Sequence, residues 1–585
     1  MKRLHYLIIA TTICATAVAQ NNDSIVTHNV SIEKEYMPQV IKVKRTDIEL
    51  PSTEPTVTKT EVTYSTETKP LETKSTFYPA KESELKSMKR PAYKSGFARF
   101  GVGFPLNWLG ELWYPIFNTN TDYFDINLNH YGISNNGKKL INTDLDLRYN
   151  KKLRTGQLYT SLGLTNSSFN YYGTDSIFTV NTVFYDVNDE KVSGKDLMPI
   201  EQSITQLNGN IGFRSLKEVK GWSYDGNINY HLLGASNSLR EHEITLNLSC
   251  GYNLDNNHLT ADLGSNVYLY NPPTAQFPLT DSVWEPQAMI SFRPRYERKW
   301  DNLYVRAGAK LWFAINKGNV VAASPDIEVR YAFAKIFDVY GGIGGDYQFT
   351  SLATTFKENR YYNMSERMQS NDYTPFDFFA GFNVRPFTGL IFDASISYKM
   401  IANQHFFYNK QFDCLSTPNE WPDKQDSERV YSNTFTVDNT RATLLNLEAR
   451  LAYNLKERYT FHVKGKYNGW NILTPNIEAW NKPTWEADAG IEAMVTKNFS
   501  LNANFYYGSE RLNKLPKTDG TLDVRTLAPI YDLNLAANYT FKKQWSLFVQ
   551  ANNILGSSKA LSYQQQWYGY DNIGFNLLIG ATIAF

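Results

Sequence analysis

The sequence predicts an all-β protein, a transmembrane antiparallel β-barrel of about 22 strands that follows a largely extended N-terminal segment. Three observations predict this fold: the pattern of the last strand, the number of alternating segments, and the lengths of the links between them. In residues 572–585, Leu577, Ile579 and Ile583 share one face, and glycine, asparagine and threonine dominate the other. A strand with one wholly apolar face and one small or polar face suits a wall between lipid and water.

From Gly96 onward the chain consists of runs of roughly 9 to 16 residues in which apolar and polar side chains alternate. A period of two is typical of a strand with one buried face. We count 22 such runs between residues 96 and 585, of which the run at 107–117 is the least regular. We keep this run because an even number of strands is needed to bring both ends of the barrel to the same side.

The links between the runs alternate between short and long. Links such as 334–335 and 541–543 are short, whereas links such as 173–201, 350–373 and 403–440 are long. Outer-membrane barrels have short periplasmic turns and long external loops. A soluble β-sandwich has no reason to alternate in this way over so many hairpins, so the links predict a closed membrane barrel.

The alternation also predicts which side chains face inward. On the run at 441–453, Leu447 and Leu451 would face lipid while Glu448 and Arg450 face the lumen. A lipid-facing arginine at the bilayer midplane costs about 2–4 kcal/mol, so charges should avoid that face. The predicted lumen-lining residues are Asp144, Asp146, Arg148, Arg293, Arg295, Arg306, Lys310, Asp326, Glu328, Arg330, Glu448, Arg450, Glu486, Asp488 and Glu492.

A 22-stranded wall encloses a lumen wide enough to need a plug. Inward charges of both signs could orient a polar solute, or they could pair with a polar filler. The candidate fillers are residues 20–95, entering from the periplasmic side, and the loops 173–201, 350–373 and 403–440, folding in from outside.

The N-terminus predicts export and then an extension. Lys2 and Arg3 precede a mostly apolar stretch, and small residues come before Gln20, so residues 1–19 are predicted to be a signal peptide cleaved after Ala19. Residues 20–95 contain no glycine and are rich in threonine and proline, a composition that cannot build a core. We interpret them as a periplasmic extension that fills the lumen or binds a partner. The barrel then spans residues 96–585.

Composition and motifs exclude several classes of protein. Lysine plus arginine number 59 against 58 acidic residues, so nucleic acid is not an expected partner. The histidines lack metal-site spacing, and no local motif marks a nucleophile, so we expect no metal, no cofactor and no enzyme activity. Glu241 and its neighbours His242 and Glu243 are expected to form a solvated rim.

The last residues resemble a known family. The segment Trp545-Ser546-Leu547-Phe548-Val549-Gln550-Ala551-Asn552-Asn553-Ile554-Leu555-Gly556, with the final Gly-x-x-Gly-x-x-x-x-Phe strand, is similar to the end of TonB-dependent receptor barrels. The resemblance covers the barrel, about 490 residues, and it implies a location in the outer membrane of Gram-negative bacteria. The C-terminal Phe585 resembles the signal that the barrel-assembly machinery reads, which makes that machinery and outer-membrane lipid expected partners.

The chain departs from that family at its N-terminus. Only residues 20–95 precede the predicted barrel, so a conventional plug domain is expected to be absent, as in plugless receptor-like barrels whose N-terminal segment carries a Glu-Tyr-x-Pro element. Here that element ends in Glu35-Tyr36-Met37-Pro38. Residues Asp23, Ser24, Ile25, Val26 and Thr27 are faintly similar to a TonB box, the strand that a receptor offers to the energising protein, and they also fit the start of a disordered extension.

These observations leave two functions open. The first is uptake or passage of a polar solute or ligand across the outer membrane through a TonB-receptor-like barrel. The alternative is a non-transporting barrel subunit or scaffold of a larger outer-membrane complex, which would hold a periplasmic partner through its N-terminal segment.

Overall fold

The computed structural model describes most of the chain beyond residue 95. The described residues are 96–135, 137–173, 183–185, 191–193, 201–216, 221–273, 284–333, 336–363, 370–411, 431–456, 458–516, 522–542, 544–557, 564–572 and 574–585. The predicted signal peptide, the extension, the TonB-box-like residues and much of the loops 173–201 and 403–440 lie outside these residues.

Twenty-two strands form a single sheet. They are β1 (Phe97–Phe104), β2 (Asn107–Asn118), β3 (Asp122–Asn135), β4 (Lys138–Lys152), β5 (Gly156–Asn170), β8 (Glu201–Ser215), β9 (Gly221–Ala235), β10 (Arg240–Leu254), β11 (Asn257–Asn271), β12 (Gln287–Lys299), β13 (Leu303–Ile315), β14 (Val321–Phe333), β15 (Phe337–Gln348), β16 (Asp372–Val384), β17 (Leu390–Gln411), β18 (Tyr431–Leu455), β19 (Tyr459–Ile472), β20 (Trp485–Met494), β21 (Phe499–Gly508), β24 (Ile530–Lys542), β25 (Trp545–Asn552) and β28 (Asn576–Ala584).

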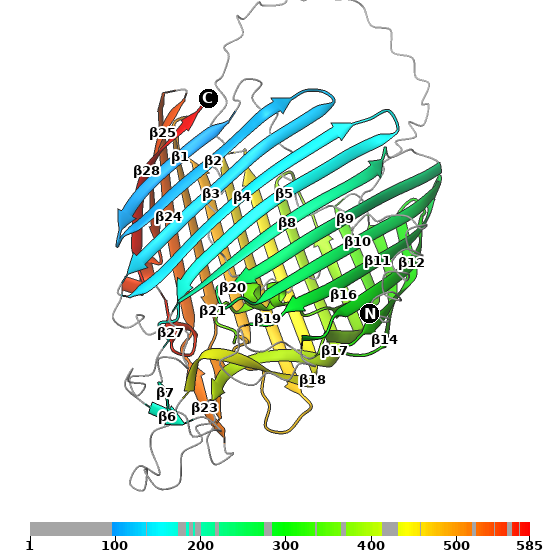
Figure 1. Cartoon of the computed structure of the whole chain (residues 1–585). Coiled ribbons are helices and arrows are strands. Elements are labelled where there is room, and N and C mark those ends of the chain that lie inside the picture. The colour runs from blue at the N-terminus through cyan, green and yellow to red at the C-terminus, as the bar shows by residue number, and fades with distance from the viewer. Residues whose placement is uncertain are drawn as a thin grey trace, which may run out of the picture.

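The sheet closes on itself. Each of these strands pairs antiparallel with the next one along the sheet, and β1 pairs with both β2 and the last strand, β28. Phe97 lies opposite Ala584, and the backbones of Gly96 and Phe585 exchange two hydrogen bonds of 2.8 and 3.0 Å. The predicted closed 22-stranded antiparallel barrel is therefore confirmed (Figure 1).

Short elements decorate one end of the barrel. They are β6 (Val183–Tyr185), β7 (Lys191–Ser193), the helix α3 (Leu352–Glu358), β22 (Arg511–Pro516), β23 (Leu522–Leu527), the 3₁₀ turn η3 (Ile554–Ser557), β26 (Gln565–Trp567) and β27 (Tyr570–Asp571). In Figure 1, β6, β7, β23 and β27 lie at the end opposite the C-terminus. The long links thus gather at one end and the C-terminus lies at the other, as the link lengths predict.

The largest difference from the predicted strands concerns the link 403–440. β17 and β18 continue through most of it as a paired hairpin, with irregular pairing between Ile401 and Gln404. Sequence alternation marks only the part of each strand that crosses lipid, because the outer part of this hairpin packs on other loops rather than on lipid.

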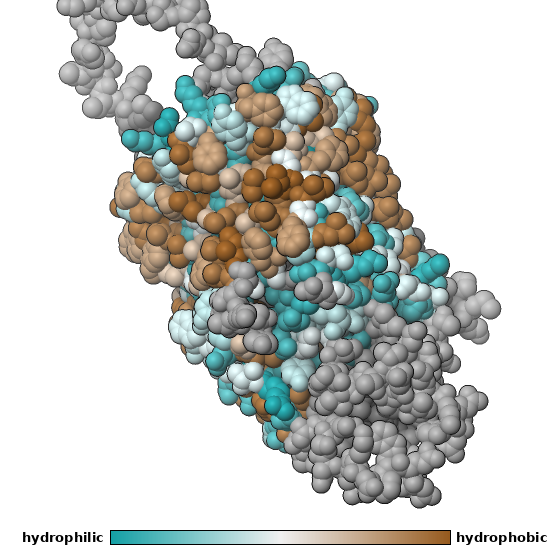
Figure 2. Space-filling model, turned by 90° about the vertical axis from the view of Figure 1, so that its left-hand side faces the viewer, coloured by the Kyte–Doolittle hydropathy of each residue, from teal (hydrophilic) through white to brown (hydrophobic). Residues whose placement is uncertain are grey.

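The outer face of the sheet is apolar. The side chains of Leu162, Ile228, Leu447 and Val463 are exposed there, and polar, charged or small residues occupy the alternate positions. Figure 2 shows the resulting continuous apolar surface on one side of the barrel, with a hydrophilic end beyond it. In the described part of the chain, no helix is long and apolar enough to cross a membrane. The apolar belt is formed by strands.

A charge placed on the two faces of β9 should have opposite consequences. Ile228 is 52% exposed on the lipid face near the middle of the strand, whereas Asn229 faces the interior. Ile228→Arg should destabilise the folded barrel by about 2–4 kcal/mol, because arginine is then transferred into hydrocarbon. Asn229→Arg should cost less than about 1 kcal/mol. Urea unfolding in lipid vesicles measures both, and equal losses would show that the two faces are assigned wrongly.

Candidate functional site

The loop between β15 and β16 folds into the barrel and carries α3. The helix begins after Ser351, whose hydroxyl accepts a hydrogen bond of 3.1 Å from the Thr354 amide. The Leu352 and Ala353 amides donate to the Glu241 carboxylate at 2.8 and 3.2 Å. Glu241 lies on β10, which is separated from β15 by four barrel strands, so the helix reaches across the interior to be capped.

This cap corrects one expectation. The Glu241 side chain is not part of a solvated rim, because its exposed fraction is 0%. The first amides of a helix have no partner within the helix, and a carboxylate placed at them satisfies these donors and the positive end of the helix dipole. Glu241 therefore fixes the position of the inserted loop.

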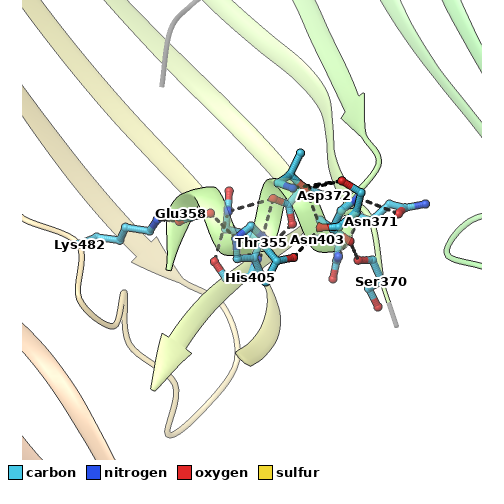
Figure 3. Close-up of polar contacts among 12 residues, drawn as sticks. Thr355, Glu358, Ser370, Asn371, Asp372, Asn403, His405 and Lys482 are labelled. Atoms are coloured by element: carbon cyan, nitrogen blue, oxygen red, sulfur yellow. Dashed lines mark hydrogen bonds and ion pairs between the residues drawn. The ribbon is translucent and has the colours of Figure 1, made fainter. Parts of the chain in front are cut away.

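The other end of α3 is held by a chain of charges, which we call the latch: Glu358, Asp372, His405 and Lys482 (Figure 3). The His405 Nε2 atom lies 2.7 Å from Glu358 Oε2, and its Nδ1 atom lies 2.7 Å from Asp372 Oδ2. The Lys482 ammonium lies 2.6 Å from Glu358 Oε1. These residues come from α3, β16, the outer part of β17 and the link between β19 and β20, so the latch ties the inserted loop to three parts of the rim.

The electrostatics of the latch favour its charged form. Burial alone would lower the pKa of His405, but the carboxylates of Asp372 and Glu358 outweigh it and raise that pKa to about 10. Burial would raise the pKa of Glu358, yet Lys482 and His405 together hold it well below its usual range. Both groups are charged at neutral pH. Breaking the latch would leave each buried charge without its partner, which is unfavourable.

Aromatic side chains fill the space between the inserted loop and the wall. Tyr361 stacks on Tyr570 with ring centroids 3.5 Å apart, and Trp567 packs against Phe407 and Phe435. The cluster of buried side chains comprises Phe169, Tyr171, Ile204, Leu233, Leu239, Trp284, Leu352, Phe356, Tyr361, Tyr362, Phe407, Phe435, Trp567 and Tyr570. It joins the wall strands to described residues of five links, which include α3 and the segment Trp567–Tyr570, at the outer end of the barrel.

The structure places every predicted lumen-lining residue on a barrel strand, on the face opposite the exposed apolar side chains. Those on β4 are Asp144, Asp146 and Arg148; those on β12, β13 and β14 are Arg293, Arg295, Arg306, Lys310, Asp326, Glu328 and Arg330; those on β18 and β20 are Glu448, Arg450, Glu486, Asp488 and Glu492. Their role in lining a path for solutes remains a prediction.

Most of these charges contact an opposite charge across the sheet. Arg306 lies 3.2 Å from Asp326 and 2.8 Å from Glu328, which also contacts Arg330. Farther along the sheet, on β18–β20, Glu448 pairs with Lys464 at 2.9 Å and Glu486 with Lys466 at 3.6 Å. Register explains these contacts, because Arg306 lies directly opposite Glu328 and Lys466 opposite Glu486.

The remaining predicted residues have other partners or face water. Arg295 contacts Asp262 and Glu297, Arg148 contacts Asp125, and Asp488 contacts His462. The Lys310 ammonium donates to the Gly345 carbonyl at 2.9 Å, in the glycine-rich part of β15. Asp146 and Arg148 on β4 and Glu492 on β20 are exposed although they face inward, so water reaches the interior beside these two strands.

Sequence reasoning missed the latch and the cap. The contacts join residues more than 100 positions apart, such as Glu358 and Lys482, and no local spacing marks them. Described residues of two of the candidate fillers, the loops 350–373 and 403–440, contribute buried side chains at the outer end, among them Phe356, Phe407 and Phe435. Among those residues, no group of three or more histidine, cysteine or acidic side chains could hold a metal ion.

Comparison with known proteins gives a likeness of fold. No protein-family model and no curated protein matches the sequence. Among solved structures, a mutant of the ferric enterobactin receptor PfeA from Pseudomonas aeruginosa matches with a TM-score of 0.58 and 12% identity, over 84% of this chain and 80% of that chain. The siderophore receptor PirA from Acinetobacter baumannii matches with a TM-score of 0.58 and 10% identity, over 84% and 80%.

The ferric-catecholate import receptor Fiu from E. coli K12 also matches, with a TM-score of 0.58 and 11% identity over 84% of this chain and 82% of that chain. These proteins are named as receptors and an importer, not as enzymes. The chain thus has the fold of outer-membrane receptor barrels, as its C-terminal strands predict. Together with the apolar belt, this fold makes it an outer-membrane protein.

The latch should make closure depend on pH. His405 keeps its proton to about pH 10 in the closed loop, but a released histidine loses it near 6.5. The stabilisation of the closed loop by protonated His405 is therefore complete below about pH 6.5, declines above that pH and is lost beyond about pH 10. The lowered pKa of Glu358 acts in the opposite sense, and its contribution is lost as the pH falls below about 4.5.

Trypsin cleavage after Lys357, an exposed residue of α3, reports the release of the loop that carries this helix. Cleavage should rise between pH 7 and 10 in the natural protein and stay low in His405→Arg, whose cation persists. A parallel rise in both proteins would mean that the histidine does not control the loop.

Proposed function

We propose that this chain is an outer-membrane barrel that admits a polar solute or ligand, with the loop 349–371 as its outer gate. The gate is held by ion pairs and hydrogen bonds that can break and re-form. It lies over an interior whose wall carries charged and amide side chains. The observation that carries the proposal is the latch, because four charges from separate elements converge to hold one short helix across the lumen.

The fold likeness supports a transport role. The similar solved structures are named for iron and siderophore uptake, and the solute of this chain stays open. In this proposal the inward residues of β4, β12–β14, β18 and β20 line the path. No step calls for a catalytic residue, and we propose no enzyme activity.

Residues 20–95 complete the proposal on the periplasmic side. We assign them as an extension that enters the lumen or holds a periplasmic partner, with Asp23–Thr27 as the contact for an energising protein. Phe585 would serve as the assembly signal. Its ring lies 5.8 Å from that of Tyr114 at the closing strands, so it also packs at the closure of the sheet.

Breaking the latch should open the barrel. In planar bilayers the full-length protein should carry almost no current, and Glu358→Ala should carry steady current. Removal of one partner from a buried charge pair costs about 3–5 kcal/mol, enough to release a loop. Glu201→Ala is a matched control, because Glu201 also lies at the outer end of a strand and its side chain is 63% exposed beside Lys139.

A variant lacking residues 20–95 separates the remaining possibilities. Current from this variant alone would make the N-terminal segment the plug and would contradict a gate in the loop 349–371. Silence from every variant would favour the alternative role, a scaffold subunit that holds a periplasmic partner.

A further inference from the structure

The inner wall has two chemically different sides. On β13, β14 and β18–β20 most of the inward charges are engaged in ion pairs, as described above. On β3, β4, β8 and β9 several inward side chains are amides, and five asparagines together with one aspartate form what we call the amide strip: Asn127, Asn129, Asp146, Asn208, Asn210 and Asn229. Within the described structure, none of these six side chains makes a hydrogen bond or an ion pair.

Strand register brings the strip together. Asn127 lies opposite Asp146, which lies opposite Gly163, which in turn lies opposite Asn208. On the next pair of strands, Asn210 lies opposite Asn229. Gly163 has no side chain, so the carboxylate of Asp146 can lie close to its backbone, beside Asn208.

Water reaches the strip. Asp146 and Asn208 are exposed although they face inward, and the other four members are half-buried. Asn208 follows Ile204, a member of the cluster of buried side chains described above, by four residues on β8, or about 13 Å along the strand. On β8 the strip therefore lies on the periplasmic side of the buried cluster.

The chemistry of the strip selects a class of solute. A side-chain amide both donates and accepts hydrogen bonds, and a hydroxyl group does the same. The one charged member, Asp146, is an acceptor and repels anions. The neighbouring cation, Arg148, is held by Asp125 at 3.1 Å. A dense set of hydroxyls would satisfy these groups, whereas an anion would meet Asp146 with no free cation to offset it.

We propose that the amide strip binds a neutral, polyhydroxylated solute of oligosaccharide type. The assignment deepens the proposed function, since it names the solute class for the path behind the gate. On β13, β14 and β18–β20, most inward charges would have to leave their partners before they could contact a solute.

Equilibrium binding tests the strip without requiring the gate to open. The probe is maltotriose, and saturation-transfer NMR with the full-length protein in detergent measures its binding. Asn208→Ala combined with Asn229→Ala should weaken binding at least about fivefold, the effect of losing one hydrogen bond. The matched control is Asn446→Ala on β18, whose amide is already bonded to Asn468 at 2.9 Å, and it should leave binding unchanged.

A second probe tests the charge argument. A uronic acid trisaccharide has a similar size and three negative charges, and it should bind more weakly than maltotriose. Asp146→Asn should reduce the difference in affinity between maltotriose and the uronic acid trisaccharide. Absence of maltotriose binding, or an equal loss in Asn446→Ala, would overturn the strip as a binding site. Neither result would affect the bilayer currents, which test the gate separately.

Discussion

Closure of the backbone hydrogen-bond network is the constraint on which the rest of this structure depends. Hydrocarbon offers no partner for an open sheet edge, so a sheet can span a membrane only as a ring. Here β1 meets β28 at the two ends of the barrel chain. Because the ring must close, each strand shows one face to lipid and one to the lumen, and the polar residues of the chain are gathered inside.

An interior filled with charges must satisfy them, and the structure does so at two levels. Cross-strand neighbours such as Arg306 and Glu328 neutralise one another within the wall. At the outer end, Glu241 and the latch use side chains from the wall to hold a loop. The same kind of contact therefore has two results: in the wall it stabilises a permanent structure, and at the mouth it holds a segment that can be released.

The sequence predicts the wall well and the mouth poorly, for a physical reason. A lipid-facing strand repeats every two residues, so the strands around Leu447 and Ile579 can be recognised from local pattern. The alternation of short and long links then indicates that the number of strands is even. The contacts of the mouth have no period. Glu241 meets Leu352 at a separation of 111 residues, and Tyr570 meets the backbone of Asn433 at 137. Nothing near Glu241 distinguishes a helix cap from a rim carboxylate.

The pairing of Phe97 with Ala584 also bears on how the barrel forms. All the other neighbours in the ring are consecutive hairpins, which close small loops, whereas this last junction must bring together segments separated by the whole barrel sequence. Loop-closure entropy and contact order make such a junction slow to form. The two terminal strands therefore remain exposed edges until assembly ends. Phe97 and Phe100 on β1, with Phe585 directly after β28, are among the aromatic groups that an assembly factor would have to shield meanwhile.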